Sequence, residues 1–195
     1  VMIKNPINPD LELWMGAIER MQLAGIENIS AIHRGFSSFE KTVYRNVPMW
    51  EIPIELKVKK PEIPIICDPS HICGRRDLLA SVSQKALDLT MDGLMIESHI
   101  TPDSAWSDAA QQITPLQLGE LIANLIPRAE VSSDIAFLSQ LEKFRSEIDQ
   151  LDEKLVQLFG KRMEIARSIG KYKKENNITI LQANRWKEIY SARKV

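Results

Sequence analysis

Residues that can do metal-ligand or anion-binding chemistry follow each of four short apolar runs in the first two thirds of the chain. The first two runs end on cations, Lys4 and Arg34, which suit a phosphate or carboxylate group. The next two are followed by carboxylates and imidazoles, which together suit a divalent metal such as Mn, Fe, Co or Zn. These acidic and histidine residues are Asp68, His71, Glu97, His99 and Asp108.

The apolar runs are expected to be buried parallel strands. Helix-forming stretches, such as residues 11–25, 77–89 and 115–126, separate or follow them at a repeat of about thirty residues, which is typical of βα units. The carboxyl ends of parallel strands meet at one edge, so the polar residues would converge there. A solvated loop or structural ion network explains any one of these residues, but explains the whole set less well. The predicted strands are residues 1–4, 29–34, 63–68 and 93–98.

Four strings surround these polar residues: KNP (4–6), HRGF (33–36), CDPSHICGRRDLL (67–79) and GLMIESHITPDSAWSDAAQQITP (93–115). They resemble the second half of a 3-deoxy-D-arabino-heptulosonate 7-phosphate synthase, the first enzyme of the shikimate pathway. The resemblance implies a (β/α)8 barrel that condenses phosphoenolpyruvate with erythrose 4-phosphate and releases inorganic phosphate. A complete barrel usually needs about 250 residues. The expected fold is therefore α/β, as half of a barrel, with a small open sheet as the alternative.

The resemblance also implies roles for individual residues. Three residues match ligands of a divalent metal, Mn2+ or similar, and two cations match the phosphoenolpyruvate-binding pair, with a neighbouring aspartate expected in the catalytic set. The matching ligands are His71, Glu97 and Asp108, the cations are Lys4 and Arg34, and the aspartate is Asp68.

Several nearby residues have open roles. The family's fourth ligand is a cysteine from an early strand that this chain does not contain, and Cys67 and Cys73 are better interpreted as small core thiols than as substitutes. His99 could support a ligand or be a plain loop histidine. The pair Arg75 and Arg76 could touch phosphate, although solvated surface charge is the simpler interpretation.

The last third of the chain predicts one long helix with a partner-facing apolar stripe, beginning near Ser133 or Asp134. Arg162 interrupts the stripe, and a charge there is costly unless an anion pairs with it. Lys173 lies about 16 Å further along and about 20° around the helix, so both cations can approach one small dianion. Arg145 lies about 25 Å from Arg162 and about 100° around the helix, so it would reach a shared site only from another chain.

The string FRSEIDQLDEKLVQLFGKRMEIARSIGKYKKENNITILQANRWKEI, residues 144–189, resembles the all-helical class of chorismate mutase. That resemblance implies a homodimer of interleaved helices that converts chorismate to prephenate without a cofactor. Gln182 and Trp186 depart from the usual Asp and Glu, and the third helix is missing. A plain helical dimerisation arm is the alternative. The chorismate-binding cations are matched by Arg145, donated by the partner, and by Arg162, Lys173 and Arg185 of the same chain.

Composition and charge divide the chain near Pro127. All ten prolines fall in residues 1–127, which carry a net charge of −5, whereas residues 128–195 carry +4. We therefore expect three segments: the C-terminal half of a synthase barrel over 1–127, a linker over 128–136, and a mutase domain over 137–195 that stops before its third helix.

Overall composition limits the function classes. A formal net charge of −1 argues against a nucleic-acid binder, and no apolar stretch approaches the roughly 18 residues needed to span a membrane. The first residues lack a signal-peptide layout, and two cysteines suit a reduced compartment, which favours a cytoplasmic enzyme. The combined interpretation is a fragment of a synthase–mutase fusion. The alternatives are a 3-deoxy-octulosonate 8-phosphate synthase and a noncatalytic regulatory or assembly module.

Overall fold

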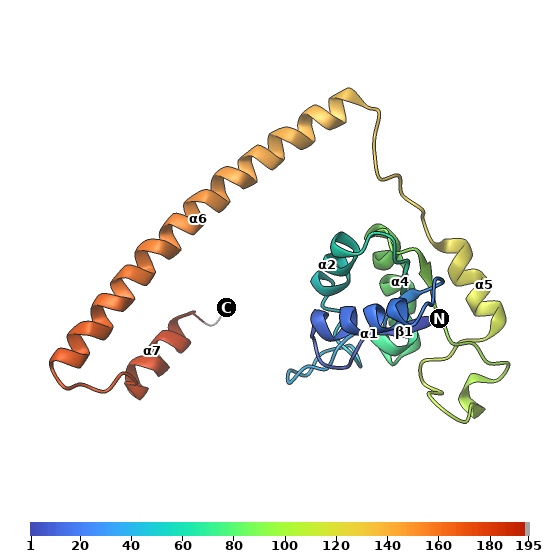
Figure 1. Cartoon of the computed structure of the whole chain (residues 1–195), viewed down its shortest axis with the longest axis horizontal. Coiled ribbons are helices and arrows are strands. Elements are labelled where there is room, and N and C mark those ends of the chain that lie inside the picture. Colours follow the sequence, from blue (N-terminus) through green and yellow to red (C-terminus); the bar gives the residue numbers. More distant parts are fainter. Residues whose placement is uncertain (194–195) are drawn as a thin grey trace. The chain divides into compact units, whose positions relative to one another are not determined.

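The computed structural model describes residues 1–193 and divides the chain into two compact units, residues 1–130 and a helical unit that begins at Val131 (Figure 1). No helix in the described residues combines the length and apolar character needed to cross a bilayer.

The first unit is built on a four-stranded parallel sheet in the order β1-β2-β3-β4. Lys4 pairs with Ile32 and His33 with Cys67, so the carboxyl ends of neighbouring strands lie side by side. This sequential parallel order confirms the α/β, half-barrel prediction. The strands are β1 (Met2–Lys4), β2 (Ser30–His33), β3 (Ile65–Cys67) and β4 (Gly93–Leu94).

The fourth strand is shorter than predicted. Only Gly93 and Leu94 pair with β3, and the chain then leaves the sheet until Ser98 forms a single parallel bridge with Ile113. As the last strand of the sheet, β4 has a neighbour on one side only, so its apolar pattern alone does not keep residues 95–98 in the ladder.

Helices and short turns connect the strands. The three predicted helical stretches form α1, α4 and α5, whereas α2 has no clear apolar period and contains Pro53, so the sequence pattern did not reveal it. The elements are α1 (Leu11–Leu23), α2 (Glu51–Lys59), α3 (Pro69–Cys73), η1 (Arg76–Leu78), α4 (Leu79–Asp88), η2 (Pro102–Ser104) and α5 (Pro115–Asn124).

The core of this unit lies between the sheet and the helices packed on it. Trp14 and Ile18 of α1, Leu56 of α2 and Ile65 of β3 are completely buried, with Val82 of α4 almost so. Burying each such side chain contributes roughly 1.5–3 kcal/mol, which holds the strand ends in fixed positions. The polar residues that follow the strands are thereby held at one edge of the sheet.

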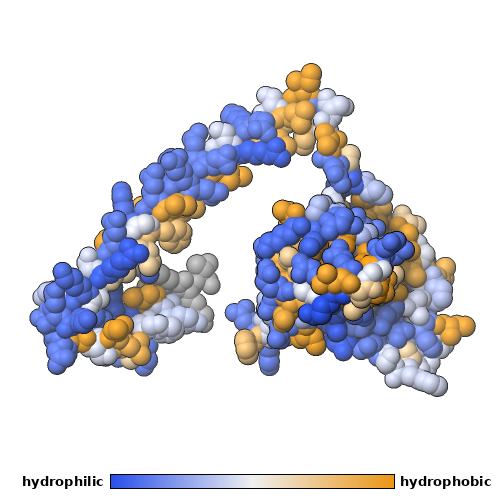
Figure 2. Space-filling model, in the orientation of Figure 1, coloured by the Kyte–Doolittle hydropathy of each residue, from blue (hydrophilic) through white to orange (hydrophobic). Residues whose placement is uncertain are grey.

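The second unit consists of α6 (Ile135–Glu175) and α7 (Ala183–Arg193). Asp134 caps α6 by accepting hydrogen bonds from the backbone of Ala136 and Phe137, which confirms the long helix and selects Asp134 over Ser133 as its cap. No residue of α6 is buried, and apolar side chains are exposed along it (Figure 2). An exposed apolar stripe of this kind needs a partner surface.

Candidate functional site

Three predicted metal ligands meet at the edge of the sheet. His71 comes from α3, Glu97 follows β4, and Asp108 lies on the loop after η2. The His71 Nε2 atom lies 3.9 Å from both Glu97 Oε1 and Asp108 Oδ2, and one ligand atom from each residue falls within 4.8 Å of the others. Ligands about 2.1 Å from one ion are separated by about 3–4 Å, and the two distances from His71 Nε2 fall in that range. This nitrogen and oxygen set therefore suits a divalent metal.

Asp68 lies behind His71. Its Oδ1 accepts a hydrogen bond of 3.1 Å from the His71 backbone and so caps α3, while Oδ2 lies 2.8 Å from His71 Nδ1. The second contact is close but not aligned as a hydrogen bond. Because Asp68 occupies the Nδ1 side, Nε2 faces the two carboxylates. The same Asp68 oxygen lies 3.5 Å from Lys4 Nζ.

The two predicted anion-binding cations stand on neighbouring strands. Lys4 ends β1 and Arg34 follows β2, and Arg34 Nε is buried without a hydrogen-bond partner among the described residues. Asn5 fixes this corner, since its Oδ1 accepts from the Arg34 backbone at 2.7 Å and its Nδ2 donates to Gly35 at 2.9 Å. A buried guanidinium donor with no partner is a ready contact for an anionic ligand.

A hydrogen-bonded path joins the two carboxylate ligands. Arg45 Nη1 donates to Asp108 Oδ1 at 2.6 Å and to Gln111 Oε1 at 2.9 Å, and Gln111 Nε2 donates to Glu97 Oε2 at 2.7 Å. The hydrogen bond from Arg45 is the main reason that the pKa of Asp108 is held below its usual value. Sequence reasoning missed Asn5, Arg45 and Gln111, because none of them ends an apolar run, and only their position inside or between the quoted strings could have signalled them.

Two residues with open roles are hydrogen-bonded within the protein. Arg76 donates to the carbonyls of Ala109 and Gln112 at 2.8 and 2.6 Å, so it fastens the loop that carries Asp108. His99 Nδ1 accepts from the Thr101 backbone at 3.0 Å, as a loop histidine would.

Both cysteines are buried free thiols. Burial is the main cause that raises the pKa of Cys67, and it raises the pKa of Cys73 to about 12. Neither belongs to the metal-ligand cluster found among the described residues. Their surroundings therefore fit the core-thiol interpretation.

The four predicted mutase cations do not form a common cluster in the described chain. Arg145 pairs with Glu142 at 2.6 Å, and Lys173 Nζ donates to the Ile180 carbonyl at 2.9 Å. Arg185 pairs with Glu188 at 2.9 Å, whereas Arg162 is exposed on α6. A single long helix spreads its charges along its axis, so these positions alone do not make a binding site.

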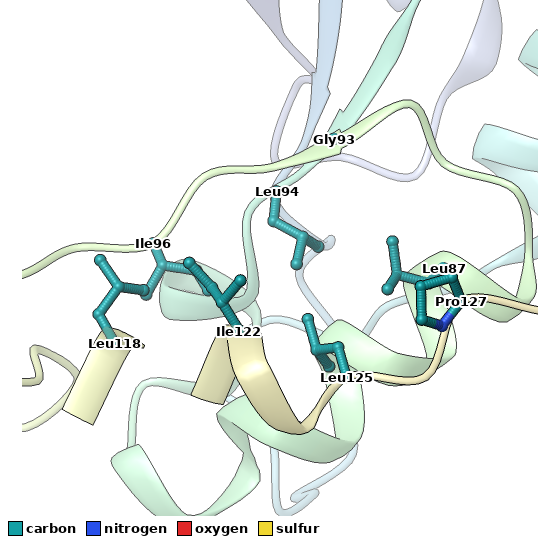
Figure 3. A pocket seen from close by; sticks show the side chains of 8 residues that line it. All are labelled: Leu87, Gly93, Leu94, Ile96, Leu118, Ile122, Leu125 and Pro127. Atoms are coloured by element: carbon teal, nitrogen blue, oxygen red, sulfur yellow. The ribbon is translucent and has the colours of Figure 1, made fainter. Parts of the chain in front are cut away.

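A cavity of about 460 Å³ is lined by residues other than those of the polar cluster, from β4, α4, α5 and the segments that follow β4 and α5 (Figure 3). It contains no titratable side chain, so it offers no acid–base or metal chemistry. Its lining residues are Leu87, Gly93, Leu94, Ile96, Leu118, Ile122, Leu125 and Pro127.

Comparison with known proteins matches the two units of the structure to two different families. Residues 1–131 match the DAHP synthetase I family, and residues 144–195 match chorismate mutase type II. The phospho-2-dehydro-3-deoxyheptonate aldolase of Thermotoga maritima is 30% identical over 125 residues, which are 64% of this chain and 36% of the relative. A crystal structure of phospho-2-dehydro-3-deoxyheptonate aldolase (DAHP synthase) from Thermotoga maritima superposes with a TM-score of 0.59 at 30% identity, over 63% of this chain and 36% of that one.

Two further relatives bear on the two parts of the chain. The T-protein of Haemophilus influenzae is 38% identical over 61 residues, 31% of this chain and 16% of the relative. A 2-dehydro-3-deoxyphosphooctonate aldolase of Desulfotalea psychrophila is 28% identical over 123 residues, 56% of this chain and 41% of the relative. The chain thus spans well under half the length of each of these curated relatives.

Proposed function

The chain belongs to the DAHP synthetase I family, and from this membership we propose that its first part condenses phosphoenolpyruvate with erythrose 4-phosphate. We propose that its last part is a chorismate mutase fused to this synthase. The observation that carries the proposal is the convergence of His71, Glu97 and Asp108 at the strand ends that also hold Lys4 and Arg34. A metal-ligand set beside two cations suits a reaction between two phosphorylated substrates.

His71, Glu97 and Asp108 would hold the divalent metal, Mn2+ or a similar ion. When bound, such an ion polarises a carbonyl oxygen as a Lewis acid, which suits attack on the aldehyde of the sugar phosphate. Asp68 keeps His71 turned toward the cluster and forms an ion pair with Lys4. We therefore assign Asp68 a positioning part in the site.

Lys4 and Arg34 would bind the phosphate and carboxylate groups of phosphoenolpyruvate. Arg34 has an unpaired buried donor, and Asn5 holds the Arg34 backbone, so the point from which the guanidinium extends is fixed before substrate arrives. Fixed cations hold the enolpyruvyl donor in line with the aldehyde and lower the entropic cost of bringing the two together.

For the mutase, Arg162, Lys173 and Arg185 would bind chorismate within one chain, and Arg145 would come from a partner. The exposed apolar stripe of α6 supports a homodimer, because a second copy would bury it. The cations would hold the dicarboxylate in a compact conformer and stabilise charge on the ether oxygen, with no cofactor.

The test uses a form of the protein extended to complete both domains. The variant His71→Ala should lose erythrose 4-phosphate-dependent phosphate release and keep conversion of chorismate to prephenate, because His71 belongs only to the barrel. His99→Ala is the matched control and should keep both activities. Condensation at the wild-type rate in His71→Ala would overturn the assignment.

The 195-residue chain by itself should release no phosphate from phosphoenolpyruvate. Its described residues include three proposed metal ligands and a sheet of four strands, whereas a (β/α)8 barrel has eight strands. Phosphate release by this chain that depends on erythrose 4-phosphate would show that its four strands suffice.

A second candidate is the octulosonate synthase reaction, favoured by the 28% identity to the Desulfotalea psychrophila aldolase. The chorismate mutase match over residues 144–195 argues against it. Comparing rates with each aldose phosphate separates the two. The donor set at His71 also argues against a noncatalytic module.

We propose that the protein acts in the cytoplasm, without nucleic-acid or membrane partners. Two buried cysteines that form no disulfide support this location. The nearly balanced charge argues against a nucleic-acid partner.

A further inference from the structure

We propose that Arg45 and Gln111 form a bridge that positions the carboxylates of Glu97 and Asp108 before a metal binds. The inference rests on the proposed metal site, and it assigns a positioning role to two residues outside the ligand set.

Each carboxylate divides its oxygens between two tasks. Glu97 Oε2 and Asp108 Oδ1 accept the bridge hydrogen bonds at 2.7 and 2.6 Å. The other oxygens, Glu97 Oε1 and Asp108 Oδ2, lie 3.9 Å from His71 Nε2. One oxygen of each ligand is therefore held by the protein, while the other faces the imidazole.

The amide of Gln111 can link these groups in only one orientation. Its Nε2 donates to Glu97, which has only acceptors, and its Oε1 accepts from Arg45, which has only donors. Gln111 is 1% exposed, so water does not compete for either bond. A buried polar group that loses its partners leaves its donor and acceptor unsatisfied, which favours keeping both bonds.

The other end of the bridge is fixed to the helix that carries His71. The Arg45 backbone donates to the Ile72 carbonyl at 3.0 Å, and the left-handed Gly74, with φ of +64°, leaves room for the Arg45 side chain. A Cβ at Gly74 would lie 2.6 Å from Arg45 Cβ. The bridge therefore ties Asp108 and Glu97 to α3 rather than only to each other.

Two effects of the bridge on metal affinity oppose one another. Arg45 places a positive charge near the cation site, which disfavours a metal ion, whereas the fixed carboxylates favour it. Gln111→Leu removes positioning without changing charge, so it isolates the second effect. Loss of a partner that orients metal ligands typically lowers metal affinity by about 10–100-fold, and we expect a loss in that range.

The experiment titrates Mn2+ into the 195-residue chain and measures free Mn2+ by electron paramagnetic resonance. Wild type should bind and His71→Ala should not, while Gln111→Leu should bind about 10–100-fold more weakly. Gln84→Leu is the matched control, because Gln84 also donates to a carboxylate, Asp88 at 2.9 Å, but far along the chain on α4. Thermal melting followed by circular dichroism checks that each variant is folded.

Wild-type affinity in folded Gln111→Leu would overturn the bridge and leave the proposed metal site standing. Absence of His71-dependent binding in wild type would overturn both. If Gln111→Leu does not fold, Arg45→Lys replaces it, since it keeps the positive charge at a side chain that is 47% exposed but lacks the guanidinium fork. Binding weakened about 10–100-fold in Arg45→Lys supports the bridge, and equal or tighter binding overturns it.

Discussion

The two units place charged residues in different ways. In residues 1–130, a parallel sheet and its loops bring His71, Glu97 and Asp108 together from separate parts of the sequence. In the helical unit, Arg145 and Arg162 stand on one helix whose apolar residues are exposed. Tertiary packing gathers the proposed ligands within one chain in the first case, whereas in the second the spacing of the two arginines led us to propose a partner chain.

This difference separates what each unit requires for function. The first unit has a sheet of four strands, and the residues of its proposed ligand cluster already have supporting contacts. For the helical unit, we propose that a second copy of α6 supplies the surface that lets the cations enclose a ligand. Mutations should therefore act within one chain in the first unit and between chains in the second.

The largest expected effect tests sharing between chains in the mutase. In a form with a complete mutase domain, Arg145→Ala and Arg162→Ala should each lose about 3 kcal/mol of transition-state stabilisation, or roughly a hundredfold in rate. Mixed dimers would contain one intact site, so random exchange should restore about a quarter of wild-type activity. Prephenate formation measures both effects, and loss without rescue under verified exchange would place Arg145 in its own chain's site.

The next effect tests whether the apolar stripe of α6 drives association. Leu155→Asp should weaken self-association about a hundredfold, because it would bury an unpaired carboxylate in a helix interface. Val156→Asp is the control, since Val156 is 70% exposed and lies about 100° around the helix from Leu155. Sedimentation equilibrium measures the dissociation constants, and equal constants for the two variants would contradict the stripe.

A smaller effect concerns acid sensitivity of the barrel unit. Burial among aromatic rings lowers the pKa of His33 from 6.5 to about 3. The contribution of His33 to the free energy of unfolding is therefore full above pH 6.5. It falls at lower pH as His33 takes up a proton in the unfolded state, by about 2 kcal/mol between pH 7 and pH 5. Urea unfolding at both pH values should show a smaller pH dependence in His33→Gln and an unchanged one in His99→Gln. An unchanged pH dependence in His33→Gln would show that other groups cause the loss.

The smallest effect concerns the turn that makes room for Arg45. Gly74→Ala should lose about 1–2 kcal/mol of stability from the left-handed backbone alone, with weaker Mn2+ binding as Arg45 moves. Gly119→Ala is the control, because nothing lies within 4 Å of its added Cβ and α5 should gain up to about 1 kcal/mol. Denaturant midpoints compare the two, and equal midpoints would contradict a backbone cost at Gly74.

The sequence predicted the carboxyl ends of the first three strands to within one residue, because periodicity and strand-end chemistry are local, but it placed the end of the fourth strand too late. Lys4, Arg34 and Asp68 end or follow apolar runs, and the long helix follows from a repeat that persists from about residue 134 to 175. Their relative positions then follow from the general geometry of parallel sheets.

The supporting residues were not predictable in the same way. Arg45 lies in a segment without apolar period, and its contact with Asp108 spans 63 positions. Gln111 is a buried amide whose role depends on hydrogen bonds with Arg45 and Glu97, neither of which is near it in the sequence. Such contacts depend on how loops pack, which no local pattern encodes.

Asp108 itself has a left-handed backbone, with φ of +50°. Aspartate and asparagine adopt this conformation more readily than most residues, so the position restricts shape as well as charge. A change to asparagine would remove the charge at little conformational cost, whereas the chemically milder change to glutamate would combine strain with a longer arm. At this position the backbone preference decides which substitution is conservative. Asparagine therefore preserves the local structure better than glutamate does.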